Sequence, residues 1–238
     1  MSASTPVTEL KVADVHLSSL NMKKTVVVKA HRERLSPESL TACAALLQAG
    51  GVIVFPTDTV YGIGCNAFHL DAINRIYEIK GRSYSKPLPV LLGKPGHLPL
   101  VAHDVSAKAF PLIEAYWPGP LTLVVNTAPM ALAASRGKNT IAVRVPDHGV
   151  IRQILSVTGL PLASTSANLS GQIPSRTFDD VKKAFFGRVD MIIDGGRCPL
   201  GRESSVVDVT HDSFLVLREG AISKRDLVKT MKLDGRLE

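Results

Sequence analysis

A short apolar run that stops at a proline sets the first limits on this fold. Residues 52–55 (VIVF) lie between glycines and Pro56, and such a run is typical of a strand covered on both faces. Because Pro56 has no N–H for the sheet, the chain is expected to leave the sheet there. Residues 57–64 (TDTVYGIG) then supply two hydroxyls, a carboxylate and two flexible glycines. Ligands of α/β proteins bind at such strand ends, although an ordinary turn is the alternative interpretation.

Strand and helix patterns alternate along the rest of the chain, and hairpin-like pairs interrupt the alternation. Strands are expected at 24–30, 52–55, 88–92, 121–125, 140–145, 161–164, 189–193, 205–209 and 214–217. Helices are expected between Ser36 and Gly50, between Asp71 and Gly81, from Ser106 to Tyr116, over 148–158 with Asp147 as the N-cap, over 178–186 and over 222–232. This pattern predicts an α/β fold, with a twisted mixed parallel and antiparallel sheet flanked by helices.

Composition limits the partners and the compartment. The 238 residues suit one large domain, predicted at 23–238, after a flexible N-terminal tail at 1–22. No apolar run approaches the ~18 residues of a membrane span, so no transmembrane helix is expected. The three cysteines are scattered and lack a C-x-x-C pair, which indicates a reducing compartment rather than disulfides or a zinc site. The formal net charge of +7 favours anionic partners such as nucleotides or RNA.

Polar loops recur at the ends of the expected elements, at 57–59, 80–86, 165–171 and 195–205. Lys80, Arg82 and Lys86 lie within one turn and loop, where their charges can converge on a polyphosphate. A solvated basic face is the alternative. The turn at 166–168 (SAN) offers hydroxyl, amide and backbone donors to a phosphate or carboxylate, and an ordinary Asx or Ser turn is its alternative.

Standard catalytic signatures are absent from the sequence. It contains no P-loop, no nucleophile elbow and no histidines at metal-ligand spacing, so no residue is assigned as a metal ligand. Gly62-Ile63-Gly64 imitates a dinucleotide fingerprint but lacks the tight strand-to-helix turn. A mechanism in this chain would depend on positioning and electrostatics, as in phosphoryl or nucleotidyl transfer.

Seven motifs occur in an order and spacing that resemble YrdC-type threonylcarbamoyl-AMP synthases. They run from about Thr25 to Ile222 and read FPTDTVYGIG, IYEIKGRSYSKPLPVLL, WPGPLTLVV, TIAVRVPDH, STSANLSG, GRESSVVDV and VLREGAI. The resemblance implies a YrdC-like curved mixed sheet with a large basic cavity. It also implies condensation of L-threonine, bicarbonate and ATP, with Mg2+, into threonylcarbamoyl-AMP and pyrophosphate. A KEOPS-like transferase complex would then use the product for the tRNA threonylcarbamoyladenosine (t6A) modification.

The resemblance also assigns site residues by motif. The family's catalytic Lys-x-Arg and Ser-x-Asn tetrad falls on Lys80, Arg82, Ser166 and Asn168. Threonine-contacting positions fall on Thr59, Arg144, Ser164 and Ser204, and Arg144 would pair with the substrate carboxylate. ATP-contacting positions fall on Arg82, Lys86, Thr140, Ser166, Ser175 and Arg218.

The chain departs from the two-domain relatives in three ways. Leu91 stands where they carry a threonine-contacting histidine, and one extra residue separates Asn168 from the next serine, which affects the assignment of Ser175. The sequence stops soon after Ile222, which is expected for a single-domain, eukaryote-like member. Such members are cytoplasmic and sometimes also mitochondrial, and the acidic, arginine-free first 22 residues favour the cytoplasm.

A non-catalytic module that binds double-stranded RNA or tRNA is the alternative function, because its cavity would also be basic. Such a module would not need a Ser-x-Asn turn opposite Lys-x-Arg. It would instead display aromatic residues for base stacking, yet aromatic residues make up only 5% of this chain. The sequence therefore favours the synthase. A carbamoyl-transferring relative from hydrogenase maturation fits less well, because its accompanying domains are missing.

Overall fold

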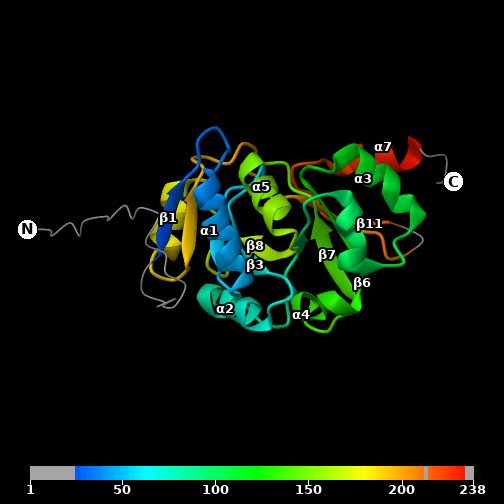
Figure 1. Ribbon diagram of the computed structural model, residues 1–238. Helices are drawn as coiled ribbons and strands as arrows, with labels where there is room; N and C mark the ends of the chain where they lie inside the picture. The colour runs from blue at the N-terminus through cyan, green and yellow to red at the C-terminus, as the bar shows by residue number, and fades with distance from the viewer. Residues whose placement is uncertain (1–24, 212–213, 234–238) are drawn as a thin grey trace, which may run out of the picture.

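One mixed sheet of eleven strands forms the centre of the part of the chain that the computed structural model describes, residues 25–211 and 214–233 (Figure 1). The strand order is β1-β9-β2-β3-β8-β4-β7-β6-β10-β11, and β5 pairs with β6 outside this path. The mixed α/β architecture predicted from the sequence is confirmed. The expected tail at 1–22 and the turn at 212–213 lie outside the described residues.

The strands are β1 (Val26–Lys29), β2 (Ile53–Phe55), β3 (Gly62–Asn66), β4 (Val90–Leu91), β5 (Ala102–His103), β6 (Leu121–Thr127), β7 (Thr140–Arg144), β8 (Leu162–Ser166), β9 (Met191–Asp194), β10 (Ser205–Asp208) and β11 (Leu215–Arg218). The helices are α1 (Pro37–Gln48), α2 (Leu70–Lys80), α3 (Phe110–Tyr116), α4 (Leu132–Ser135), α5 (Gly149–Thr158), α6 (Phe178–Phe185) and α7 (Lys224–Leu233). Short 3-10 segments lie at Pro95–Leu100, Ala107–Ala109 and Pro129–Ala131. No helix in the described ranges is long and apolar enough to cross a membrane.

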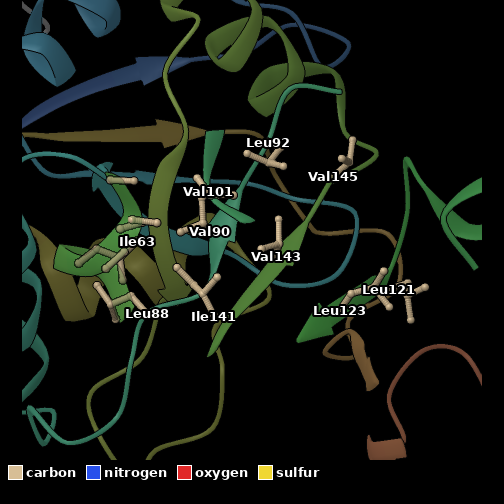
Figure 2. Packing of buried hydrophobic residues seen from close by; sticks show 14 of the residues in the cluster. Ile63, Leu88, Val90, Leu92, Val101, Leu121, Leu123, Ile141, Val143 and Val145 are labelled. Carbon is tan, nitrogen blue, oxygen red and sulfur yellow. The ribbon is translucent and has the colours of Figure 1, made fainter. Parts of the chain in front are cut away.

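Strand β2 explains why residues 52–55 are apolar throughout. Ile53 and Phe55 point into a core beneath α1 and α5, whereas Val52 and Val54 belong to the larger core on the other face. Alternate residues of a strand face opposite sides of the sheet, so a strand covered on both faces needs an unbroken apolar run. Figure 2 shows part of the larger core, which runs across the sheet from Ile63 of β3, past side chains of β4 and β7, to Leu121 and Leu123 of β6.

Residues 62–66 form a strand, which corrects the expectation of a loop with two flexible glycines. β3 pairs antiparallel with β2 and β8, so Gly62 lies opposite Phe55 and Ser166. A Cβ at Gly62 would stand 2.8 Å from the Phe55 ring and 3.2 Å from Ser164 Oγ. The glycine is therefore required for close packing of the sheet rather than for freedom of the backbone.

Gly62→Ala is expected to lower the free energy of unfolding by about 1–3 kcal/mol, because Phe55 is fully buried and has no room to move aside. Urea denaturation measures the change. Gly96→Ala is the matched control, since a Cβ at Gly96 meets nothing within 4 Å. Equal stability of the two variants would contradict this packing argument.

Histidines, rather than the expected aspartates, cap two helices. His69 Nδ1 accepts the N–H of Ala72 at the start of α2, and His148 Nδ1 accepts the N–H of Val150 at the start of α5. Asp71 and Asp147 were expected there. Asp71 lies inside the first turn of α2, and Asp147 precedes the cap of α5. The expected helix ends at Gly81 and Gly159 are confirmed, both in left-handed geometry.

Some expected elements are shorter or displaced. The strand expected at 88–92 pairs only over Val90–Leu91, since prolines at 87 and 89 remove two donors. The loop expected between 125 and 140 contains the short helix α4.

Candidate functional site

Arg144 ends strand β7 and is held from three sides in the protein interior. Its Nε donates to Gly119 O at 2.9 Å, its Nη1 to Thr59 Oγ1 at 2.8 Å and its Nη2 to Asp58 Oδ1 at 2.5 Å. A guanidinium has five N–H groups, so these bonds leave one on Nη1 and one on Nη2. Burial lowers the pKa of Arg144, and the Asp58 carboxylate opposes that shift. The result is a fixed cation with one N–H to spare on each Nη.

Asp58 is the site residue that sequence reasoning did not assign. Its side chain is only 9% exposed, and Oδ1 also accepts the main-chain N–H of Asp147 at 3.3 Å. Oδ2 is buried and has no hydrogen-bond partner among the described residues. A carboxylate between two threonines at a strand end was the available signal. The resemblance assigned Thr59 alone, and only the fold shows that Asp58 balances the charge of Arg144.

Lys80 ties the end of helix α2 to the Ser166–Asn168 turn. Its Nζ donates to Ser166 O at 2.6 Å and also to Asn168 O. Its own main-chain carbonyl accepts the N–H of Ser170 at 2.9 Å. Burial, with a smaller contribution from the Arg82 guanidinium, lowers the pKa of Lys80 to about 7. The structure therefore brings Lys80, Ser166 and Asn168 of the expected tetrad together.

Side chains of the Ser166–Asn168 turn bond within the turn itself. Ser166 Oγ donates to Asn168 Oδ1 at 2.6 Å. Asn168 Nδ2 donates to the carbonyls of Leu169 and Gln172 at 2.8 and 2.9 Å. In this conformation the polar side chains of the turn are thus hydrogen-bonded within the turn. This is the geometry of the ordinary Asx or Ser turn that was the alternative interpretation of the sequence. An anion would bind here by replacing one of these bonds.

Arg82 lies in the loop after α2, and its side chain donates to two carbonyls of that loop. Nε donates to Lys86 O at 3.3 Å and Nη2 to Pro87 O at 3.0 Å. The Lys86 side chain is exposed. Neither cation has the buried setting of Lys80.

Arg218 and Ser204 meet at the edge formed by β10 and β11. Arg218 donates from Nε to Ser204 O at 3.0 Å and from Nη2 to Ser204 Oγ at 3.2 Å, and it pairs with Glu203. Ser204 Oγ also lies 2.8 Å from Thr122 Oγ1. Arg218 borders a pocket of about 210 Å³ together with Arg176, Arg202, Glu203 and Glu219, which gives three cations against two anions.

The remaining assigned residues lie either in the same region as Arg144 or away from it. Ser164 and Ser166 lie on β8, next to β3 and β4, and β4 in turn pairs with β7 at Arg144. Ser175 joins the same region through its backbone, which bonds to Tyr61 and Ala167. Thr140 begins β7, four residues from Arg144 and therefore about 13 Å away along the strand. The structure does not place Thr140 beside Arg144.

Comparison with known proteins adds to this geometry. A family model named Sua5_yciO_yrdC, described as "Telomere recombination", matches residues 45–220. The chain belongs to the Sua5/YciO/YrdC family. Its relatives in this family include the threonylcarbamoyl-AMP synthase of Bacillus subtilis (strain 168), 38% identical over 79% of this chain and 55% of that protein. Another is the threonylcarbamoyl-AMP synthase of Pyrococcus abyssi, 33% identical over 87% of this chain and 61% of that protein.

Solved structures of the Sua5/YciO/YrdC family share the fold. The crystal structure of P. abyssi Sua5 complexed with L-threonine matches with a TM-score of 0.83 and 33% identity, over 87% of this chain and 61% of that one. The chain therefore spans roughly 55–61% of the length of these two relatives.

Proposed function

We propose that this chain condenses L-threonine, bicarbonate and ATP into threonylcarbamoyl-AMP and pyrophosphate. The observation that carries the proposal is the Arg144 guanidinium, buried at the end of β7 with one spare N–H on each Nη. A guanidinium with one spare N–H on each Nη can donate to both oxygens of a carboxylate. The names of the relatives from B. subtilis and P. abyssi, and the threonine bound to P. abyssi Sua5, support the same substrate.

In this proposal the amino acid lies between β7, β8 and the segment after β2. Arg144 holds its carboxylate, while Thr59, Ser164 and Ser204 offer hydroxyls, and each of these three side chains is buried. Asp58 fixes the orientation of the Arg144 guanidinium, and together the two side chains carry no net charge. A zwitterionic ligand suits such a site, because it brings no net charge into the interior.

The proposed chemistry begins with the threonine amine. The neutral amine attacks CO2 derived from bicarbonate, forms an N–C bond and loses a proton, which gives a carbamate. A carbamate oxygen then attacks the α-phosphorus of ATP. The new O–P bond forms as the bond from that phosphorus to the pyrophosphate oxygen breaks, and pyrophosphate leaves. Lys80, Arg82, Ser166 and Asn168 would stabilise the negative charge that develops on the phosphoryl oxygens.

ATP is proposed to contact Arg82, Lys86, Thr140, Ser166, Ser175 and Arg218. Ser166 Oγ would exchange its bond with Asn168 Oδ1 for a phosphate oxygen. The Lys80 amine already donates to two carbonyls, and only its protonated form has a third N–H to offer. We therefore assign the ammonium form of Lys80 to the nucleotide complex.

Mg2+ is proposed to enter with ATP. Among the described residues, no group of three or more His, Cys, Asp or Glu side chains could hold a metal ion. Magnesium commonly binds through substrate phosphates with few protein ligands, so this donor set is compatible with a Mg–ATP substrate. The ion would neutralise part of the phosphate charge when bound.

We also propose the extent of the catalytic domain, the partner that receives the product and the location of the protein. Residues 23–238 would act as the catalytic domain, and a KEOPS-like transferase would carry the product to tRNA for t6A formation. A cytoplasmic location is supported by the three cysteines, which are all free and buried. The activity is tested by incubation with ATP, L-threonine and 13C-bicarbonate, which should give a threonylcarbamoyl adenylate that carries the label. An unlabelled adenylate, or none, would contradict the proposal.

A further inference from the structure

Three side chains from separate segments contact one another at the loop 80–86, where the nucleotide is expected to bind. The ring of Tyr84, in that loop, stacks on the ring of Tyr77 in α2, with 4.8 Å between centres and 21° between planes. The guanidinium carbon of Arg136, from the end of α4, lies 4.9 Å from the Tyr84 ring centre and 5.3 Å from that of Tyr77. We call these residues the Tyr77–Tyr84–Arg136 cluster. None of the three carries a role in the assigned site.

The cluster is anchored on helix α2, which lies beside α4 (Figure 1). Arg136 Nη1 donates to Asn74 Oδ1 at 2.9 Å, and Tyr77 Oη donates to Lys86 O at 2.8 Å. Asn74 and Tyr77 are three residues apart and therefore share one face of the helix. The segment 82–86 is thus attached to α2 at three points: the Arg82 N–H, which donates to Tyr77 O at 3.0 Å, the Tyr84 ring and the Lys86 carbonyl.

The backbone of Arg136 indicates that its side chain has a specific use. Arg136 adopts φ +57°, and Gly137 follows with φ +75°. The left-handed region at a helix end favours glycine or asparagine over an arginine. An arginine at this position places its guanidinium against both tyrosine rings, where cation–π attraction and the bond to Asn74 offset the backbone strain.

We propose that Tyr84 and Arg136 are positioning residues that hold segment 82–86, and with it Arg82 and Lys86, for the nucleotide. The side-chain hydrogen bonds of Arg82 go to Lys86 O and Pro87 O, so they brace the loop internally. The main-chain N–H of Arg82 donates to Tyr77 O at 3.0 Å and fixes the start of the segment, and the cluster attaches the rest of it. The link to nucleotide rests on the proposed function, whereas the attachment of the loop does not.

Limited trypsin digestion tests the attachment without any assay of activity. The segment contains the Arg82–Ser83 bond, which trypsin cleaves when the loop opens, whereas the Lys86–Pro87 bond resists trypsin. Arg136→Asn removes the guanidinium and keeps a residue suited to left-handed backbone. Cleavage at Arg82 is expected to speed up roughly 5–10-fold in Arg136→Asn and in Tyr84→Ala, which loses the ring.

Two matched variants serve as controls. Tyr84→Phe keeps the ring and is expected to be cleaved at the wild-type rate. Lys138→Asn removes an exposed cation two residues from Arg136 and is also expected to leave cleavage unchanged. Wild-type cleavage of Arg136→Asn, or equally fast cleavage of Lys138→Asn, would overturn the proposed attachment.

Kinetics then test the link to the nucleotide. In Arg136→Asn the KM for ATP is expected to rise roughly tenfold, in line with the loosened loop, while the KM for L-threonine stays within about twofold. Faster cleavage with an unchanged KM for ATP would overturn the positioning role. If the purified protein makes no adenylate, the proposed function fails. The positioning role is then tested by calorimetric ATP binding, in which the Kd of Arg136→Asn is expected to exceed that of the wild type by the same factor of roughly ten.

Discussion

Replacing Arg144 with alanine is expected to lower the free energy of unfolding by about 3–5 kcal/mol and to abolish threonine-dependent turnover. The variant leaves the Asp58 carboxylate, only 9% exposed, without the cation that Nη2 provides. Asp58 Oδ2 has no hydrogen-bond partner among the described residues, and Oδ1 keeps only the main-chain N–H of Asp147 at 3.3 Å, a neutral donor. Urea denaturation measures the loss. Arg152→Ala is the control, because its ion pair with Asp147 is exposed on both sides and should change stability by less than about 1 kcal/mol.

Two further variants separate stability from binding at this site. Arg144→Met combined with Asp58→Asn removes both charges and should regain most of the lost stability without regaining turnover. Arg144→Lys keeps the charge but loses the fork, so the KM for L-threonine is expected to rise by about 10–100-fold. An unchanged KM for threonine in Arg144→Lys would contradict the carboxylate-binding role of Arg144.

Lys80→Met is expected to lower the rate of pyrophosphate release by about 10²–10³-fold. The methionine fills a similar volume but leaves the carbonyls of Ser166 and Asn168 without their donor, so the turn loses its side-chain connection to α2 and keeps only the main-chain bond from Ser170 N–H to the carbonyl of residue 80. The free energy of unfolding should also fall by about 1–3 kcal/mol, and assays belong well below the melting temperature. Lys94→Met, at an exposed lysine, is the control. Turnover of Lys80→Met at the wild-type rate would rule out a catalytic role for Lys80.

The lowered pKa of Lys80 gives the same variant a second, independent readout. With a pKa of about 7 in the free protein, the amine is mostly neutral at pH 8. Bound phosphate anions favour the ammonium form and raise the pKa, so ATP binding at pH 8 should take up a proton. At pH 6 the amine is already protonated, and the uptake should vanish. Calorimetry in buffers of different ionisation enthalpy measures it, and equal uptake by Lys80→Met would contradict this assignment.

Local patterns were enough to predict the fold class and most elements. The apolar run at 52–55 predicted a doubly covered strand, and left-handed glycines at 81 and 159 end their helices as expected. The strand at 62–66 was missed because its glycines read as loop residues. Only the pairing with β2 and β8 shows that Phe55 excludes a larger side chain at Gly62. Packing across strands far apart in sequence leaves no local signal.

In the candidate site, too, some residues could be predicted from local motifs and others only from the fold. Motifs located Lys80, Ser166 and Asn168, and the fold places them in contact although 86 residues separate Lys80 from Ser166. Asp58 was missed because its role depends on Arg144, and their ion pair spans 86 positions. The Tyr77–Tyr84–Arg136 cluster likewise joins residues whose types suggest an ordinary helix face, loop and helix end. Such contacts become visible only once the sheet brings their elements together.

Pyrophosphate release by the purified protein tests the central claim most directly, with ATP and Mg2+ present and with L-threonine and bicarbonate added separately and together. The account predicts release only when both are present, and its near-complete loss in Arg144→Lys at low threonine concentration. Release without threonine, or none from a folded sample that binds ATP, would contradict it. The second result would favour the RNA-binding function that the net charge of +7 also allows.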